Sequence, residues 1–271
     1  MVPRLFAKLM MVLAVACGVG SLILFAVFPV GSYAFVRMHW PLSGILLWDG
    51  LLCLAFFLQH SGMVRRGFRD RIAVIVPRQY HRAVYSIASG IVLTGVVILW
   101  QPSDAHVLVI AGPFRLAPYT GVLIAIAVFI WGAVVLQGID LFGLAAIKAH
   151  LHGTTEAASE FVIRGPYRWV RHPWYAAAIV LIWSCVDFTA DRLLFNVLWT
   201  AWICIGAELE EKDLSAELGG VYDRYRQQVP MLIPWRGVYR PASAMKTLEC
   251  RTTSHQGDSR ADLYKKGLEI L

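Results

Sequence analysis

Charged residues are scarce in this chain. Lys, Arg, Asp and Glu make up 16% of its 271 residues, whereas a typical soluble domain has about 25%. Hydrophobic residues make up 58%, and the mean hydropathy is +0.58. This composition argues against an ordinary soluble fold. It predicts a polytopic membrane protein built as one compact helical bundle.

Three other features are missing from the sequence. The five cysteines show neither Cys-x-x-Cys nor Cys/His spacing, so neither a metal site nor a redox cofactor is expected. The net charge of +7 is not accompanied by an RNA- or DNA-binding motif, so nucleic acid is not expected as a partner. The first apolar run is too long for a signal peptide and is interpreted as a true span.

Six apolar segments alternate with polar loops. We expect the last two to form a hairpin whose arms are short against the roughly 20 residues of an ordinary span. The predicted fold is therefore all-α: a polytopic transmembrane helix bundle of about six spans, the last two a short hairpin, with a cytosolic pocket. The six segments run over about 9–35, 42–60, 83–100, 119–139, 173–186 and 193–207.

The pattern divides the chain into three parts. Residues 1–140 hold the N-terminal transmembrane helices, and residues 141–236 form a C-terminal half that carries most of the unusual motifs. Residues 237–271 form a polar tail with no apolar face. We expect this tail to be disordered or partly foreign to the native chain.

The sequence RGPYRWVRHPWY occupies residues 164–175. Pro173 suits the first position of a helix, where its missing N–H costs nothing. Arg171 and His172 would then lie at a helix start, whose free N–H groups attract carboxylates. From residue types alone, a basic anchor with an interfacial aromatic belt is an equal alternative.

A second cluster, ELEEKDL, occupies residues 208–214 at the end of the last apolar segment. On a helix Glu210 and Glu211 point about 100° apart, so one can face the bundle and the other the cytosol. A carboxylate facing Arg171 or a bound ammonium group would be stabilised as the anion. The alternative is a solvated helix end, although negative charge there opposes the macrodipole.

Two further ionisable groups end apolar segments. His60 follows Gln59, and Asp140 follows the fourth segment. Such groups near membrane helix ends are functional candidates, or they are interfacial residues hydrogen-bonded to neighbours. A short amphipathic helix with Tyr222 and Tyr225 is expected before the Val-Pro pair at 229–230.

The ordered set of motifs from 165 to 230 resembles the C-terminal half of integral membrane methyltransferases, which include isoprenylcysteine carboxyl methyltransferases and phospholipid N-methyltransferases. The shared pattern is Gly-x-Tyr, Arg-His-Pro-x-Tyr, a Glu pair, Gly-x-x-Tyr-x-x-Tyr and Val-Pro. Within this group, LQHS at 58–61, DLFGL at 140–144 and LEEKDL at 209–214 look most like bacterial methanethiol S-methyltransferases.

The resemblance implies a cytosol-facing pocket for S-adenosyl-L-methionine in the C-terminal half. The segment SEFV at 159–162 aligns with a loop that supplies backbone contacts in this family. The cofactor-binding residues implied by the resemblance are Glu160, Phe161, Val162, Tyr167, His172, Pro173, Trp174, Tyr175 and Glu210.

The implied acceptor is a small thiol such as methanethiol, or another membrane-dissolved substrate, converted to a thioether. In the isoprenylcysteine enzymes an Arg lies four residues before the cofactor-facing Glu, and here that position is Gly206. Carboxyl methylation, phospholipid N-methylation and a non-enzymatic, denitrification-associated membrane protein remain alternatives. A thiol must lose its proton to react, and the candidate catalytic groups are Arg171, His172 and His60, in no order.

The distribution of basic residues predicts the orientation in the bilayer. Short cytoplasmic loops carry excess Lys and Arg, so both termini and the loop at 65–82 should lie in the cytosol of a bacterial inner membrane, with 101–118 and 187–191 outside. Cysteine-accessibility labelling of an Ile75→Cys variant in intact cells should therefore show protection. Labelling from the outside would contradict the six-span arrangement.

Overall fold

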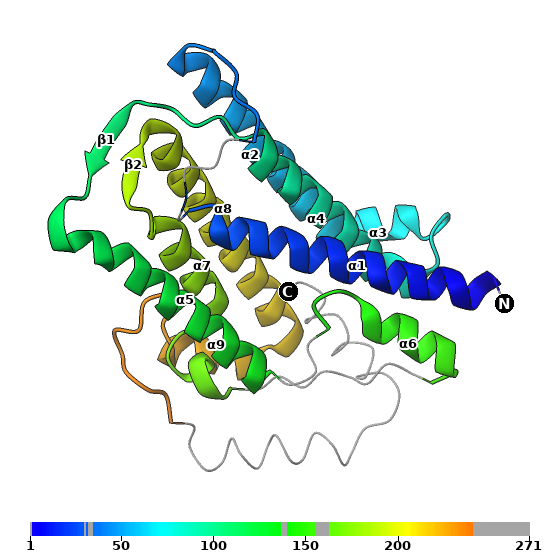
Figure 1. Ribbon diagram of the computed structural model, residues 1–271. Coiled ribbons are helices and arrows are strands. Elements are labelled where there is room, and N and C mark those ends of the chain that lie inside the picture. Colours follow the sequence, from blue (N-terminus) through cyan, green and yellow to red (C-terminus); the bar gives the residue numbers. More distant parts are fainter. Residues whose placement is uncertain (1, 30, 32–34, 137–139, 155–162, 241–271) are drawn as a thin grey trace. The chain divides into compact units, whose positions relative to one another are not determined.

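A computed structural model describes residues 2–29, 31, 35–136, 140–154 and 163–240. Glu160, Phe161, Val162 and the tail from 241 onward lie outside these ranges. The described chain is almost wholly helical (Figure 1), which confirms the all-α class. Its contacts divide it into two compact units. Unit 1 comprises Met1–Leu123, Asp140–Glu156 and Ile179–Trp202; unit 2 comprises Ile124–Ile139, Ala157–Ala178 and Ile203–Leu271.

Several helices in the described ranges are long and apolar enough to cross a membrane, and one apolar helix, α7 (Pro173–Trp183), is shorter. This confirms the polytopic bundle. The five long helices are α1 (Val2–Val27), α2 (Leu42–Val64), α4 (His81–Leu99), α5 (Leu116–Val135) and α8 (Ala190–Leu218). The shorter helical elements are α3 (Arg66–Ile72), η1 (Arg78–Tyr80), η2 (Gly112–Arg115), α6 (Leu144–His152), η3 (Gly165–Arg168) and α9 (Gly220–Gln228).

Two predicted spans end elsewhere than expected. The first was expected to reach 35 but ends at Val27, because Pro29 cannot continue a helix that needs its N–H and Gly31 follows closely. The second arm of the predicted hairpin is not short, since α8 has 29 residues. Its helix continues through the charged ELEEKDL segment, whose Glu, Leu and Lys residues favour helix as much as apolar ones do.

In unit 1, α4 packs against both α1 and α2. Gly90 of α4 makes the α1 contact close, because a Cβ built there would lie 2.5 Å from the carbonyl oxygen of Cys17. About half of the residues in the largest buried cluster of this unit are aromatic, and their rings meet edge to face, stacked or tilted. They include Phe25, Phe28, Phe56, Trp100, Phe195 and Trp199.

Two short strands join loops that are distant in sequence. β1 (His106–Val109) pairs antiparallel with β2 (Asp187–Thr189), so the two loops predicted to lie outside the membrane meet within unit 1. Just beyond β2 the buried carboxylate of Asp191 accepts hydrogen bonds from the Trp100 indole at 3.0 Å, from the Ser103 backbone at 3.0 Å and from its hydroxyl at 2.8 Å. These bonds fix the start of α8.

Unit 2 has its own small core. The predicted amphipathic helix is present as α9, and its two tyrosines are buried with Val229 and Tyr239. Arg168 of η3 and Tyr239 exchange two bonds of 2.7 Å, one from the guanidinium and one from the Tyr239 backbone N–H. The segment after α9 is thereby tied to the turn that precedes α7.

The close approach of α1 and α4 yields a stability prediction. Gly90→Ala should lower the free energy of unfolding by about 1 to 3 kcal/mol, because the new methyl group meets backbone that cannot rotate away. Gly95→Ala on the same helix is the matched control, since a Cβ there meets no atom within 4 Å. Thermal unfolding of both purified variants measures the difference, and equal midpoints would refute the contact.

Candidate functional site

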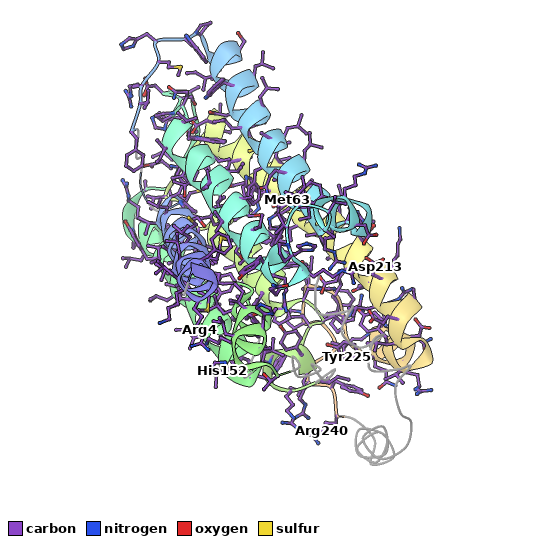
Figure 2. The ribbon with its side chains drawn as sticks, turned by 90° about the vertical axis from the view of Figure 1, so that its right-hand side faces the viewer. Arg4, Met63, His152, Asp213, Tyr225 and Arg240 are labelled. Atoms are coloured by element: carbon purple, nitrogen blue, oxygen red, sulfur yellow. The ribbon has the colours of Figure 1, made fainter. Side chains whose placement is uncertain are left out.

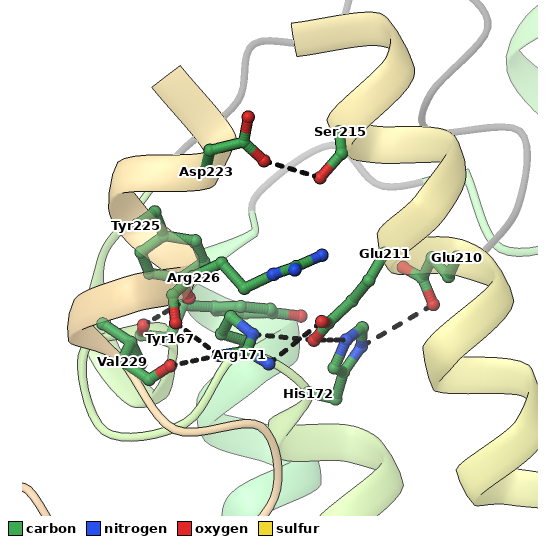
Figure 3. A network of polar contacts seen from close by, with 10 residues as sticks. All are labelled: Tyr167, Arg171, His172, Glu210, Glu211, Ser215, Asp223, Tyr225, Arg226 and Val229. Atoms are coloured by element: carbon green, nitrogen blue, oxygen red, sulfur yellow. Dashed lines mark hydrogen bonds and ion pairs between the residues drawn. The ribbon is translucent and has the colours of Figure 1, made fainter. Parts of the chain in front are cut away.

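In unit 2, His172 lies buried between two glutamates (Figure 3). Its Nε2 is 3.1 Å from Oε1 of Glu211, within hydrogen-bonding distance. Its Nδ1 is 3.7 Å from Oε2 of Glu210. The three side chains are 5 to 8% exposed. His172 immediately precedes α7, and both glutamates lie near the end of α8, so two helix ends supply the cluster.

Arg171 holds Glu211 with two parallel bonds. Its Nε is 2.7 Å from Oε1 and its Nη2 is 3.0 Å from Oε2, the fork geometry in which arginine binds carboxylates best. Nη1 donates to the carbonyl oxygens of Arg226, at 2.8 Å, and Val229. The guanidinium therefore joins α8 to the end of α9, and its charge is balanced by a carboxylate.

The backbone completes this junction. The N–H groups of Arg171 and His172 donate to the carbonyl oxygens of Pro230 at 2.9 Å and Met231 at 3.1 Å. Pro230 and the residue after it therefore supply acceptors for the two residues that precede α7. The segment that α9 leads into thus fixes both the backbone and the side chain of Arg171.

The two glutamates do not divide between the bundle and the cytosol, an arrangement that helix geometry allows. Glu210 and Glu211 are both buried, and both face the ring of His172. An imidazole carries nitrogen atoms on two edges, so two carboxylates about 100° apart on one helix can meet the same ring. Each glutamate therefore faces the buried His172 ring, and neither faces the solvent.

Aromatic side chains from 167 to 175 surround the cluster. The Tyr175 ring stacks on His172 with centroids 5.3 Å apart and planes 7° apart. The Trp174 indole fills the space where Gly132 lacks a side chain, because a Cβ there would lie 2.0 Å from Nε1. Burial, and then the charge of Glu210, raise the pKa of Tyr167, so its hydroxyl stays a neutral hydrogen-bond donor.

Among the described residues around His172, Oε2 of Glu210 and Nε1 of Trp174 are buried and make no hydrogen bond. One is an acceptor and the other a donor. Buried polar groups are rarely left unsatisfied, and each exception needs an explanation. A polar ligand with both donors and acceptors would supply one. In the described residues no group of three His, Cys, Asp or Glu side chains could hold a metal ion.

Comparison with known proteins decides the family. A methanethiol S-methyltransferase from a Pseudomonas species is 39% identical over 202 residues, which cover 73% of this chain and 75% of that protein. One from Pseudomonas deceptionensis is 34% identical, covering 72% and 74%. One from Bradyrhizobium diazoefficiens is 32% identical, covering 69% and 66%. The chain belongs to the methanethiol S-methyltransferase family.

Membership of this family confirms the resemblance read from the motifs, and the protein is a methyltransferase. The non-enzymatic alternative is therefore wrong. No family model matches the chain, and no solved structure matches it. The residues that perform the transfer consequently have to be argued from the geometry of this methyltransferase itself.

The other candidate residues have separate surroundings. His60 lies in unit 1, where its Nε2 is 2.7 Å from the Tyr85 hydroxyl and its ring meets Phe56 and Trp202. Asp140 accepts from two backbone N–H groups at 2.7 Å and so caps the start of α6. For Asp140 the interpretation as a residue hydrogen-bonded to its neighbours is the correct one. Glu160, Phe161 and Val162 lie outside the described residues.

Sequence reasoning missed Glu211 as a member of the cluster and missed the role of the carbonyl groups after α9. The signal for Glu211 was present, since it adjoins Glu210 on a helix. The sequence held no signal for the carbonyl acceptors, because every residue type carries the same backbone carbonyl group. Tyr222 and Tyr225 are spaced to share one helix face, and Tyr225 donates to the carbonyl of Tyr167 at 2.7 Å.

The buried ion pair yields a prediction with an internal control. Arg171→Met should lower the free energy of unfolding by about 3 to 5 kcal/mol, because it leaves the buried Glu211 charge short of its main partner. The double variant Arg171→Met/Glu211→Leu should recover part of this loss, since no charge is then stranded. Thermal unfolding of the three proteins tests the idea, and a double variant less stable than Arg171→Met would contradict it.

Proposed function

We propose that this methyltransferase transfers the methyl group of S-adenosylmethionine to a small thiol such as methanethiol and releases the thioether, dimethyl sulfide in that case. The observation that carries the proposal is the buried Glu210 carboxylate, whose Oε2 makes no hydrogen bond and lies 3.7 Å from Nδ1 of His172. Membership of the family supports the same reaction. The chemistry requires a methyl donor, a nucleophile and exclusion of water.

The residues of unit 2 fit this methyl donor. S-adenosylmethionine carries an ammonium group and ribose hydroxyls that donate hydrogen bonds, and a carboxylate and ring nitrogens that accept them. Glu210 would accept from such a donor, and the Trp174 indole would donate to such an acceptor. When bound, the sulfonium supplies an electrophilic methyl carbon. Tyr167, Pro173 and Tyr175 would complete the wall, and the family likeness adds backbone contacts from 160–162.

The chain's own contribution to the rate would be positioning. Holding two reactants in line can account for about 7 to 11 kcal/mol of a barrier in favourable cases. Arg171 and Glu211 fix the His172 ring, which in turn stands 3.7 Å from the acceptor oxygen of Glu210. A carboxylate held in this way offers a bound ammonium a preset partner, with little reorganisation when the ligand arrives.

The thiol proton needs an acceptor, because the thiolate is the nucleophile. The nitrogens of His172 both face carboxylates, and Arg171 is engaged by Glu211 and two carbonyl groups. His60 lies in unit 1, where its ring contacts the Tyr85 hydroxyl. All three residues stay candidates for the group that accepts the proton or stabilises the thiolate.

Gly206 supports a small acceptor over a prenylcysteine carboxylate. It lies one helical turn before Glu210 on α8, so both point to the same side of the helix. A Cβ built at Gly206 would meet no atom within 4 Å, so the position offers open space and no charge. A buried carboxylate substrate would lack a counter-ion there, whereas a small thiol needs none.

One assay tests the whole proposal. Purified protein in lipid nanodiscs is supplied with methyl-labelled S-adenosylmethionine and, in separate reactions, methanethiol, a prenylcysteine and phosphatidylethanolamine. We expect labelled dimethyl sulfide from methanethiol and far slower labelling of the other two. Methyl-ester formation on the prenylcysteine without thioether would promote carboxyl methylation, and N-methylation of the phospholipid would promote the other alternative.

A paired variant tests the role of Glu210. Glu210→Gln should weaken binding of S-adenosylmethionine by tenfold or more, because a hydrogen bond to a charged group is worth about 1.5 to 3 kcal/mol. Glu208→Gln changes the same charge on the same helix but at an exposed position, so its affinity should match that of the wild type. Calorimetry gives both values. Equal weakening by the two variants would reduce the effect to net charge alone.

A further inference from the structure

The connection between α2 and α4, residues 65–80, combines two features that rarely occur together. Val74 and Ile75 are 87% and 85% exposed, more than any other large hydrophobic side chain in the described ranges. Arginines Arg65, Arg71 and Arg78 are exposed on either side of them. Asp70 is the one acidic residue in this stretch. An apolar tip flanked by cations is the composition of an interfacial element.

The apolar tip is held in a fixed conformation. The backbone N–H of Ala73 donates to Arg69 at 3.0 Å, and those of Ile75 and Val76 donate to Ile72 at 2.9 and 2.7 Å. The turn after α3 is therefore closed by its own hydrogen bonds.

Neighbouring contacts set the direction of the turn. Val76 packs against the cluster formed with Ala7 and Tyr80, and His81 Nε2 lies 2.8 Å from the Val76 carbonyl oxygen. Val76 thus faces the protein while Val74 and Ile75 face away from it. The packing of Val76 therefore leaves Val74 and Ile75 exposed, and an apolar partner outside the unit would be needed to bury them.

The position of this connection between two membrane-length helices makes lipid the apolar partner. It links α2 and α4, two consecutive membrane-length helices that pack together, so it emerges at the bilayer surface. In Figure 2, Met63 labels the last turn of α2, next to the short helix α3. Side chains at this level meet headgroups and the outer ends of the acyl chains.

We propose that residues 65–80 form a binding element for anionic phospholipids, with Arg71 and Arg78 on the headgroup phosphate and Val74 and Ile75 in the outer acyl layer. Each arginine near an anionic surface contributes about a fivefold gain in affinity. The two apolar residues add affinity that a headgroup without acyl chains does not receive. The element is independent of methyl transfer and does not rest on the proposed reaction.

The test uses the full chain in neutral detergent micelles and the short-chain lipid dioctanoyl phosphatidylglycerol, titrated by calorimetry. Dioctanoyl phosphatidylcholine and glycerol 3-phosphate serve as the comparison ligands. We expect the phosphatidylglycerol to bind most tightly. The double variant Arg71→Gln/Arg78→Gln should weaken its binding by about 25-fold, and Ile75→Asn should weaken both lipids without changing binding of glycerol 3-phosphate.

Arg115→Gln is the matched control, because Arg115 is an exposed arginine of another loop, 3.7 Å from Asp187. It should bind the anionic lipid as the wild type does. If the double variant fails to fold, the wild type alone decides the matter, since 0.5 M salt should weaken binding of phosphatidylglycerol at least fivefold. Equal affinity of the wild type for the two lipids, or an equal loss in Arg115→Gln, would overturn the proposal.

Discussion

The arrangement of unit 2 depends on one ion pair, the fork between Arg171 and Glu211. It fastens the start of α7 to the last turns of α8, and through Nη1 it fastens both to the end of α9. His172 takes its orientation from the same carboxylate. A pair this well buried gains little net stability from its charges, so its contribution is geometric: it leaves one arrangement of three helix ends in which no charge is stranded.

The two adjacent glutamates of this cluster differ in their hydrogen bonds. Glu211 accepts bonds from both Arg171 and His172, whereas Oε2 of the neighbouring buried Glu210 makes no hydrogen bond and lies 3.7 Å from the His172 ring. Glu211 therefore holds the scaffold together. A ligand that donated a hydrogen bond to Glu210 would offset the cost of leaving that buried oxygen unsatisfied.

The sequence predicts much of the fold and part of the candidate site. Long apolar runs predicted the spans, and the Arg-His-Pro and Glu-Glu motifs pointed to the segments that meet at His172, although not to Glu211 as a member of the cluster. Some errors came from local residue effects that the apolar pattern outweighed, and others from backbone contacts that residue type does not encode. Helix propensity extended α8 through its charged end, and Pro29 shortened α1. Burial of both glutamates depended on a ring that offers two edges. The acceptors of Arg171 Nη1 are backbone carbonyl groups, which any residues at 226 and 229 would provide.

Asp191 has a consequence for the order in which the chain assembles. Its buried carboxylate draws donors from residues 88 and 91 positions earlier. The donors, Trp100 and Ser103, are synthesised first, and their acceptor Asp191 follows only after nearly ninety further residues. The start of α8 therefore cannot reach its final state by local folding. Closing so long a loop is entropically costly, and the event that closes it joins the start of α8 to the segment that follows α4 within unit 1.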